Sequence, residues 1–402
     1  MRQTSSIFFT AVQKIGYRVF VDCCTMHMMK MIIPILITAC AAPVVCDVSS
    51  RSVPVHPPHV ESFSIGFNDE TIRGFCLLID ARTPEEKTRD MAQGSPAGPV
   101  IVFFHGHAQR PDVAYEFTSK LALLSRSGMV VIPVCDTPYG INPSRHGDSG
   151  KDVILMEMVR FVLAREGIAI SGYSPICDTS VTINGVRLAA EKDISGTRLV
   201  LVGWSHGGIL ARRFAHAYPG AVGWLGQVCP AGYEHWGAWK LTGRFAGESA
   251  RISINIFKGQ AAETLRSGWG FTKGFMGDFL RSIPSAAMCL DVGKMRRVGK
   301  DIKDCTLYCD SSQFSAAHLE RIVVIFGRED TCMDPQQQLG IKDPDSVWQD
   351  DLNRFKETFF ADVPVRERIT LRILKGTHLA PVIHNDLYAK TLLADLGQIQ
   401  EH

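Results

Sequence analysis

Residues 197–218 read TRLVLVGWSHGGILARRFAHAY and decide the fold of this chain. The apolar run 197–202 is typical of a buried β-strand, because it carries no polar residue on either face after its first two positions. The run 208–218 has the spacing of an amphipathic helix, and Pro219-Gly220 stops it. The stretch therefore predicts a strand, a sharp turn and a helix.

Ser205 stands at the tip of that turn, with Gly203 and Gly207 two residues away on either side. Glycine is needed at these positions because bulky side chains would collide with the adjoining strand and helix. The serine hydroxyl is then held at a helix N-terminus, where developing negative charge is stabilised. A loop serine is the plainer interpretation of Gly-x-Ser-x-Gly alone, but the strand and helix around it favour a catalytic nucleophile.

A serine nucleophile needs a base and an acid that orients the base, expected in the chain order Ser, acid, His. Asp330 begins a turn after the buried strand predicted at 322–326, and we predict that it is the acid. His378 lies on a loop after the strand predicted at 369–374, and we predict that it is the base.

Each partner of Ser205 has a competitor nearby. Glu329 is longer than Asp330 and lies one residue earlier, whereas Asp334 precedes a proline and is more typical of a turn or helix start. His384 competes with His378 but lies closer to the last predicted helix.

An oxyanion hole needs two N–H donors. The backbone N–H of His206, directly after the nucleophile, is the first candidate. The second candidate is the backbone N–H of His107, on the loop after the apolar run 98–104, where Gly106 allows a close approach to substrate. We expect the side chain of His105 to order this loop rather than contact substrate.

Strands alternate with helices along the rest of the chain, which predicts an α/β architecture: a mostly parallel sheet with helices on both faces. In such sheets the chemistry lies beyond the carboxyl ends of the strands. The first two strands form an antiparallel hairpin with a turn at Asn68-Asp69. In all, strands are expected at 60–67, 74–80, 98–104, 129–134, 199–202, 222–229, 322–326 and 369–374, and helices at 111–125, 152–166, 208–218 and 385–396.

Two long gaps, 167–195 and 230–318, interrupt the alternation. The second is far longer than an ordinary connection, so we expect an inserted helical cap or lid there, with extra scaffold packing as the alternative. It contains the aromatic, glycine-spaced stretch 268–280. The expected order is a first core part at 59–229, the cap, and a second core part at 319–402.

These motifs together resemble the α/β-hydrolase superfamily from about Val60 to the end of the chain. The resemblance implies an eight-strand core with a cap before the acid-bearing strand. Three family patterns are missing: the His-Gly-Gly-Gly donor loop of some esterases, the His-Gly-Gly-Pro-Gly of proline iminopeptidases, and the Asp nucleophile of dehalogenases and epoxide hydrolases. The motifs are His105-Gly106-His107, Gly203 to Gly208, Gly327 to Asp330, and Gly376-Thr377-His378.

The expected activity is hydrolysis of carboxylic esters through an acyl-serine, with no cofactor and no metal. The aromatic stretch of the expected cap favours an apolar acyl chain, as in a carboxylesterase or lipase acting on small-molecule or lipid esters. An acyltransferase or a serine peptidase would use the same three residues. A non-enzymatic surface lipoprotein is the remaining alternative, although a binding module has no need of all three.

The first 47 residues have the features of an export segment. Lys30 precedes the short apolar run 31–40, which is too short to span a bilayer comfortably. Cys40 closes a stretch similar to a bacterial lipoprotein processing box, which makes it a candidate lipidation site and membrane tether. Residues 48–58 then form a linker. We expect a periplasmic or cell-surface protein; the alternative is a buried N-terminal element in a cytoplasmic one.

About the first 25 residues exceed what a signal sequence needs, which favours translation from Met26, Met28 or Met29. The net charge of +2 gives no indication of a nucleic-acid partner. The sequence contains no phosphate-binding loop and no Cys-x-x-Cys pair, so nucleotide, zinc-finger and thioredoxin-like functions are disfavoured.

Overall fold

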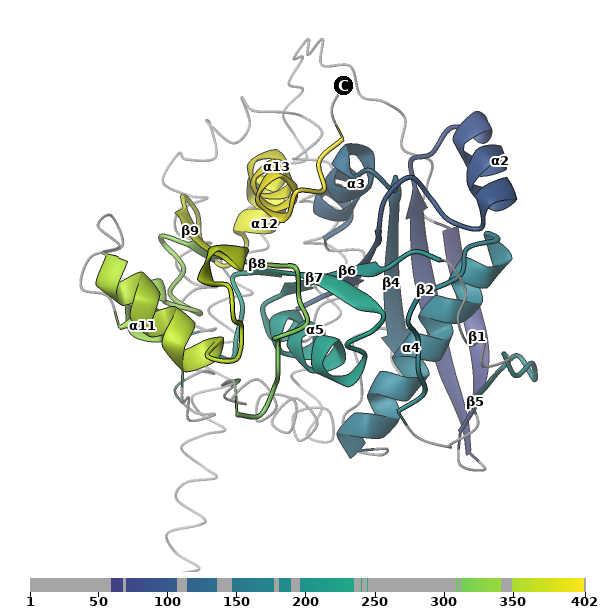
Figure 1. Cartoon of the computed structure of the whole chain (residues 1–402), viewed down its shortest axis with the longest axis horizontal. Coiled ribbons are helices and arrows are strands. Elements are labelled where there is room, and N and C mark those ends of the chain that lie inside the picture. Colours follow the sequence, from purple (N-terminus) through teal and green to yellow (C-terminus); the bar gives the residue numbers. More distant parts are fainter. Residues whose placement is uncertain are drawn as a thin grey trace, which may run out of the picture. The chain divides into compact units, whose positions relative to one another are not determined.

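A nine-stranded sheet is the centre of the described chain (Figure 1). The computed structural model describes residues 59–67, 70–106, 114–135, 147–176, 181–188, 196–234, 240, 244, 309, 312–340 and 349–400. These residues all belong to the unit Ser52–His402. The strand order is β5-β1-β2-β4-β3-β6-β7-β8-β9. The strands are β1 (His59–Phe67), β2 (Glu70–Asp80), β3 (Val100–Phe104), β4 (Met129–Cys135), β5 (Val181–Ile183), β6 (Leu199–Trp204), β7 (Val222–Val228), β8 (Arg321–Gly327) and β9 (Ile369–Leu374).

The sheet is parallel from β4 through β3 and β6 to β9, and antiparallel where β5, β1, β2 and β4 pair. Every residue of β3 and β6 is buried, as expected for parallel strands that are covered on both faces. In β1 the side chains of Phe63, Ile65 and Phe67 are buried, and those of their neighbours are more exposed.

Helices cover both faces of the sheet (Figure 1). On one face α4, α5 and α11 pack into a core that includes Val102, and on the other α3, α12 and α13 pack into a core that includes Ile101 and Phe103. The helices are α2 (Pro84–Gln93), α3 (Tyr115–Leu124), α4 (Gly147–Arg165), α5 (His206–Ala217), α10 (Pro335–Leu339), α11 (Gln349–Phe359), α12 (Ala380–Ile383) and α13 (Asn385–Leu396), with a 3₁₀ turn, η4 (Arg366–Arg368).

The predicted α/β architecture is confirmed, and most predicted strands and helices lie within about two residues of the observed ones. The exceptions are the starts of three elements: β2 begins at Glu70 rather than 74, α3 at Tyr115 rather than 111, and α4 at Gly147 rather than 152. One expectation was wrong: the sheet has nine strands rather than eight, because the gap 167–195 contributes β5 at the sheet edge. Val181–Ile183 is too short to produce a periodic signal in the sequence.

Several predictions lie outside the described residues. They are the export segment with Cys40, the linker, the turn at Asn68-Asp69, the loop residue His107, and most of the expected cap. Within the described part of the chain, no helix is long and apolar enough to cross a membrane.

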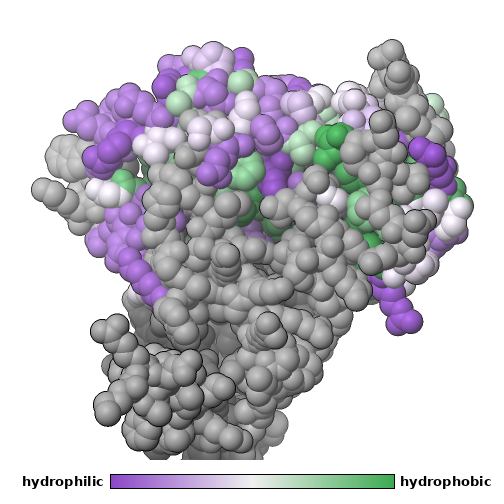
Figure 2. All heavy atoms as spheres, turned by 90° about the horizontal axis from the view of Figure 1, so that it is seen from below, coloured by the Kyte–Doolittle hydropathy of each residue, from purple (hydrophilic) through white to green (hydrophobic). Residues whose placement is uncertain are grey.

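Exposed hydrophobic side chains are dispersed over the described surface. Figure 2 shows one face, on which hydrophobic residues lie among many hydrophilic ones. The large hydrophobic side chains that are exposed belong to separate elements and connections: Val60, Met91, Ile176, Val186, Val365 and Leu387.

Candidate active site

Ser205 occupies the turn between β6 and α5 with φ +56° and ψ −124°, a conformation that residues other than glycine rarely adopt. Neighbouring backbone holds it there. The Ser205 N–H donates to Val228 O at 3.1 Å, and the Ser205 carbonyl accepts from Ala231 N at 3.0 Å and Gly208 N at 2.9 Å. These bonds fix a strained turn that presents a side chain at the carboxyl end of the sheet.

Relieving this strain should stabilise the protein. We expect Ser205→Gly to raise the free energy of unfolding by about 1–3 kcal/mol, since glycine adopts positive φ without a Cβ penalty. Urea denaturation followed by circular dichroism measures the change. The alanine variant at the same position keeps the Cβ and serves as the control; equal stability of the two variants would contradict the interpretation of strain.

The glycines around Ser205 are required by close backbone packing. A Cβ on Gly203 would lie 2.2 Å from Gly207 O, and a Cβ on Gly207 would lie 2.0 Å from Phe104 O. Atoms cannot approach so closely, so β3, β6 and the start of α5 can meet only with glycine at both positions.

Ser205 and its two predicted partners form one chain of hydrogen bonds. Ser205 Oγ lies 2.9 Å from His378 Nε2, and His378 Nδ1 lies 2.9 Å from Asp330 Oδ2. Since a carboxylate only accepts, Nδ1 carries the proton and Nε2 is left to accept from the serine hydroxyl. All three side chains are buried.

Backbone contacts hold the acid loop (residues 328–334) against the histidine loop (residues 375–379). The other carboxylate oxygen of Asp330 accepts from Met333 N at 2.8 Å. Glu329 bonds Gly376 twice, through its backbone N–H at 3.0 Å and through its carboxylate, which accepts from Gly376 N. Glu329 therefore anchors the backbone of the histidine loop, while Asp330 contacts the imidazole.

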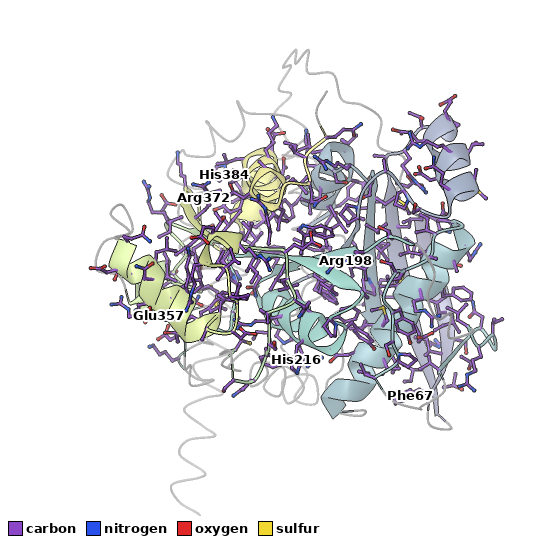
Figure 3. The ribbon with its side chains drawn as sticks, viewed as in Figure 1. Phe67, Arg198, His216, Glu357, Arg372 and His384 are labelled. Carbon is purple, nitrogen blue, oxygen red and sulfur yellow. The ribbon has the colours of Figure 1, made fainter. Side chains whose placement is uncertain are left out.

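The other two competitors lie elsewhere. Asp334 caps α10, where its carboxylate accepts from Gln336 N at 2.9 Å, in line with its helix-start pattern. His384 joins α12 to α13 (Figure 3), and its backbone N–H donates to Ala380 O at 2.7 Å.

The structure adds positioning contacts that the sequence analysis missed. Trp204 is fully buried, and its indole N–H donates to the backbone carbonyl of His378 at 3.1 Å. On β7, the side-chain amide of Gln227 donates to Gly208 O of α5 at 2.8 Å and accepts from the Tyr233 hydroxyl. No sequence signal points to these residues, because the packing of the strands and helices brings each pair together.

A buried ion pair anchors the far side of α5. Arg213 Nη2 lies 2.9 Å from Asp152 Oδ1, and Arg213 Nε lies 3.0 Å from Asp152 Oδ2, so the guanidinium binds the carboxylate with two of its nitrogens. Such a fork restrains orientation as well as distance. The helix that begins at the nucleophile is thus tied to α4.

The predicted oxyanion donors are described only in part. His206 is the first residue of α5, where the N–H groups of the opening turn have no carbonyl partner inside a helix. His107 lies outside the described residues, so its role stays a prediction. The His105 ring is buried, with Nδ1 2.8 Å from Gly106 O, which agrees with the expected loop-ordering role.

Potential metal ligands gather beside the acid. Oxygen, sulfur and nitrogen atoms of Asp330, Cys332 and His378 lie within 4.8 Å of one another. Burial first, and then the neighbouring Asp330, raise the pKa of the Cys229 thiol well above its usual range.

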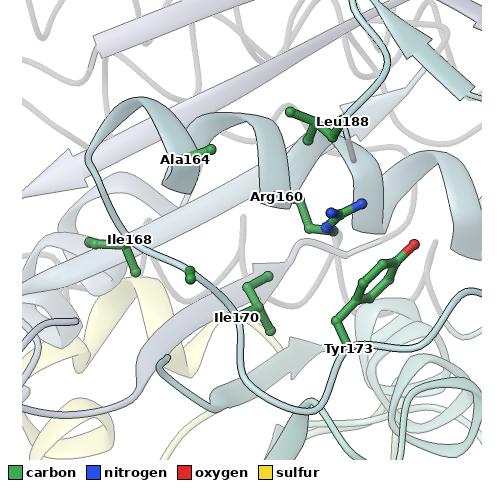
Figure 4. Close-up of a pocket in the computed structure, with 7 residues that line it drawn as sticks. Arg160, Ala164, Ile168, Ile170, Tyr173 and Leu188 are labelled. Carbon is green, nitrogen blue, oxygen red and sulfur yellow. The ribbon is translucent and has the colours of Figure 1, made fainter. Parts of the chain in front are cut away.

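A small pocket lies at the opposite end of β6 (Figure 4). Ile170 in its wall bridges to Thr197, just before β6, whereas Ser205 follows the last residue of that strand. Arg160 binds Glu157 at 2.8 Å and lies over the Tyr173 ring. None of the predicted site residues lines this pocket; its walls are Arg160, Ala164, Ile168, Ala169, Ile170, Tyr173 and Leu188.

Two half-buried histidines give the fold a pH dependence. Burial, and then Lys375, lower the pKa of His384, while burial and Arg198 lower that of His318. The folded state thus binds fewer protons than the unfolded state below about pH 6.5. Stability is fully present above that pH and is lost as pH falls through the folded-state pKa values.

We therefore expect the urea midpoint to fall between pH 7.5 and pH 5.5 by less in a His318→Gln/His384→Gln double variant than in the native protein. Denaturation curves at the two pH values measure this. An unchanged difference in midpoint would show that other groups carry the dependence.

No protein-family model matches this sequence, and no curated protein matches it. Solved structures with a similar fold include an α/β hydrolase enzyme from a Medee basin deep-sea metagenome library, at 12% identity over 84% of this chain and 99% of that chain, with a TM-score of 0.46. A thermophilic esterase from Thermogutta terrifontis is 11% identical over 84% of this chain and 97% of that chain, with a TM-score of 0.45. A probable hydrolytic enzyme from Pseudomonas aeruginosa is 15% identical over 85% of this chain and 94% of that chain, with a TM-score of 0.46.

The fold of this chain is the α/β-hydrolase fold, as its sheet topology and its strand–turn–helix at Ser205 define it. The chain order Ser205, Asp330, His378 is also the order expected for that fold.

Proposed function

We propose that this protein is a serine hydrolase that cleaves carboxylic esters through an acyl-serine intermediate, as carboxylesterases and lipases do. The observation that carries the proposal is the chain of hydrogen bonds from Ser205 through His378 to Asp330, with two links of 2.9 Å. Nucleophile and base lie within hydrogen-bond reach, and the base is oriented by a third group. The strained serine turn is a second support.

In the first half-reaction His378 Nε2 takes the hydroxyl proton as Ser205 Oγ attacks the ester carbonyl. Asp330 keeps the Nδ1–H tautomer in place and stabilises the imidazolium. The proton then passes from His378 to the departing alcohol, and an acyl-serine is left. In the second half-reaction His378 takes a proton from water, the resulting attack releases the carboxylate, and Ser205 regains its proton.

Negative charge on the carbonyl oxygen develops in both tetrahedral intermediates. In this proposal the backbone N–H groups of His206 and His107 bind it, and the start of α5 adds its positive end. Losing one such donor typically costs about 3 kcal/mol in the barrier.

The choice of an ester rests on the sequence. The aromatic stretch 268–280 lies in the expected cap, outside the described residues, and favours an apolar acyl group. An acyltransferase or peptidase would need the same hydrogen-bond chain, so the substrate assay has to separate these activities.

The decisive experiment is labelling of the folded protein with a fluorophosphonate probe, followed by peptide mapping. The expected result is one adduct, on the peptide that contains Ser205. Turnover is then compared across p-nitrophenyl esters of increasing chain length and matched anilides. Esters should be hydrolysed faster than anilides; absence of labelling, or a label on another serine, would overturn the proposal.

Replacing the acid should cost most of the turnover and leave the fold intact. We expect Asp330→Asn to lower kcat about 10⁴-fold, because the amide stabilises the wrong imidazole tautomer. Asp334→Asn is the matched control: it alters the same loop, and asparagine still caps α10, so kcat should change little. Comparable losses in the two variants would refute the assignment of Asp330.

Export is a separate part of the proposal and rests on residues 26–47 alone. In a bacterial host the chain should fractionate with membranes, and Cys40→Ala should release it. Recovery from purified protein of an intact N-terminal peptide containing Arg2 or Lys14 would contradict removal of this segment.

A further inference from the structure

A mixed group of ligand atoms surrounds the acid and base of the proposed triad. Atoms of Asp330, Cys332 and His378 lie within 4.8 Å of one another, and each residue is at most 4% exposed. A second thiol lies nearby: Cys229 is fully buried, and its sulfur lies 4.0 Å from the carbonyl oxygen of Thr377, the residue before His378. The proposed hydrolysis uses the carboxylate and the imidazole but neither thiol.

This donor set matches the preferences of one class of cation. Thiolate, imidazole and carboxylate together are the ligands of Zn²⁺, whereas Mg²⁺ and Ca²⁺ prefer oxygen alone. In a tetrahedral zinc site, neighbouring ligand atoms are separated by about 3.3–3.8 Å. The ligand atoms of Asp330, Cys332 and His378 lie within 4.8 Å of one another. Side-chain shifts of about an ångström would bring them to the spacing of a tetrahedral site.

We propose that Asp330, Cys332 and His378 form a binding site for a thiophilic divalent cation such as Zn²⁺, and that the bound ion switches catalysis off. Binding itself is independent of the activity; the inhibition rests on the proposed serine hydrolase function.

Inhibition follows from the tautomer of His378. In the hydrogen-bonded chain Nδ1 carries the proton and faces Asp330 Oδ2. A cation held by that carboxylate and the Cys332 sulfur lies on the Nδ1 side, so Nδ1 must bind it through its lone pair. The ring proton moves to Nε2, and the thiol releases its own proton to solvent.

The consequence falls on Ser205, whose hydroxyl lies 2.9 Å from Nε2. A protonated Nε2 donates a hydrogen bond and cannot take the serine proton. The nucleophile therefore loses its base.

The position of Cys332 is fixed by the chain around it. Its sulfur lies 3.8 Å from the backbone carbonyl of Arg244, and the Arg244 guanidinium donates to Thr331 O at 3.3 Å. These contacts tie residues 331–332 to Arg244 and place the thiol next to Asp330. The hydrogen bond donated by the thiol is given up when the thiol ionises and binds the ion.

The test uses the full chain after treatment with a chelator. Co²⁺ is titrated as a spectroscopic substitute for Zn²⁺, and the near-ultraviolet thiolate-to-cobalt absorption is recorded. The expected result is saturation at one ion per chain. Zn²⁺ should compete with Co²⁺ and inhibit p-nitrophenyl ester hydrolysis over the same concentration range, and the chelator should restore the rate.

Variants then locate the ion. Cys332→Ala should lose the thiolate absorption and weaken metal binding and inhibition at least about 100-fold, each rate being compared with that of the same variant without metal. Cys76→Ala, at a buried thiol on β2, is the matched control and should keep the absorption.

Each outcome decides one part. Native protein without a thiolate absorption, or an absorption that persists in Cys332→Ala, overturns the site. If the thiolate absorption saturates at one ion per chain but the rate of ester hydrolysis does not change, the proposed inhibition is refuted. Metal-free protein that hydrolyses no ester refutes the proposed function, while the cobalt spectrum still decides the site. If Cys332→Ala does not fold, Cys332→Ser replaces it.

Discussion

Replacing Ser205 with alanine is expected to lower kcat for p-nitrophenyl esters about 10⁶-fold and to abolish fluorophosphonate labelling. The hydroxyl oxygen forms the covalent bond to the acyl group, and in its absence neither His378 nor Asp330 has a proton transfer to assist. KM should change little, because the lost atom contributes to the transition state more than to substrate binding.

Alanine keeps the Cβ and therefore the strain of this turn, so the free energy of unfolding should stay near the native value. The matched control is Ser119→Ala, at a buried serine of α3 outside the site, which should keep its turnover and its label. Residual turnover in the Ser205 variant above about 10⁻³ of the native rate would mean that another group supplies the nucleophile.

The sequence was sufficient to predict which residues the structure joins in the hydrogen-bonded chain, because of where parallel strands end. Ser205 and Asp330 each follow a buried apolar strand soon after its last residue, and His378 follows the half-buried strand β9 at the sheet edge. Neighbouring parallel strands bring such ends to one edge of the sheet. The choice of Asp330 over Glu329 followed from the same geometry: one residue further into the turn, the side chain contacts the imidazole rather than the loop backbone.

The contacts that tune this site could not be predicted, since packing creates them. Trp204 ends β6 directly before Ser205 and has the character of an ordinary core residue, yet its indole N–H donates to the carbonyl of His378. Gln227 is a single polar residue in a buried strand, and its partner Gly208 lies on a different element. Such pairs can be identified only once the positions of the strands relative to one another are known.

Three of the elements that the sequence analysis missed have two different explanations. For α2 the signal was present: Thr83 and Glu86 form a capping box with Pro84 at the helix start, but the helix is too polar to show a strong apolar stripe. For β5 and α12 the signal is absent, because elements of three or four residues have no measurable periodicity.

Substitution of Gly207 by alanine should have the largest effect on stability. The new Cβ would lie 2.0 Å from Phe104 O and 2.8 Å from His105 O, and both atoms are backbone. No rotamer change can relieve such contacts, so the end of β3 would have to separate from α5. Phe104 pairs with Gly203 in the sheet, and the separation would also break the ladder beneath the nucleophile.

We expect a loss of about 3–5 kcal/mol in the free energy of unfolding, a large fraction of the stability of a typical domain. Chemical denaturation followed by circular dichroism measures it, with thermal unfolding as a second measure. Gly94→Ala is the matched control: its Cβ would meet nothing within 4 Å, and only the positive φ of +67° is unfavourable, so the loss should be about 1 kcal/mol.

A comparable loss in the two variants would mean that the backbone around Ser205 can yield, in which case the strained turn would not be enforced by its neighbours. A much larger loss at Gly207 would mean that packing of β3 against the start of α5 fixes the nucleophile before any substrate arrives. In that case the free energy that holds Ser205 in its unfavourable conformation comes from the sheet itself, and activity and stability depend on the same few backbone contacts.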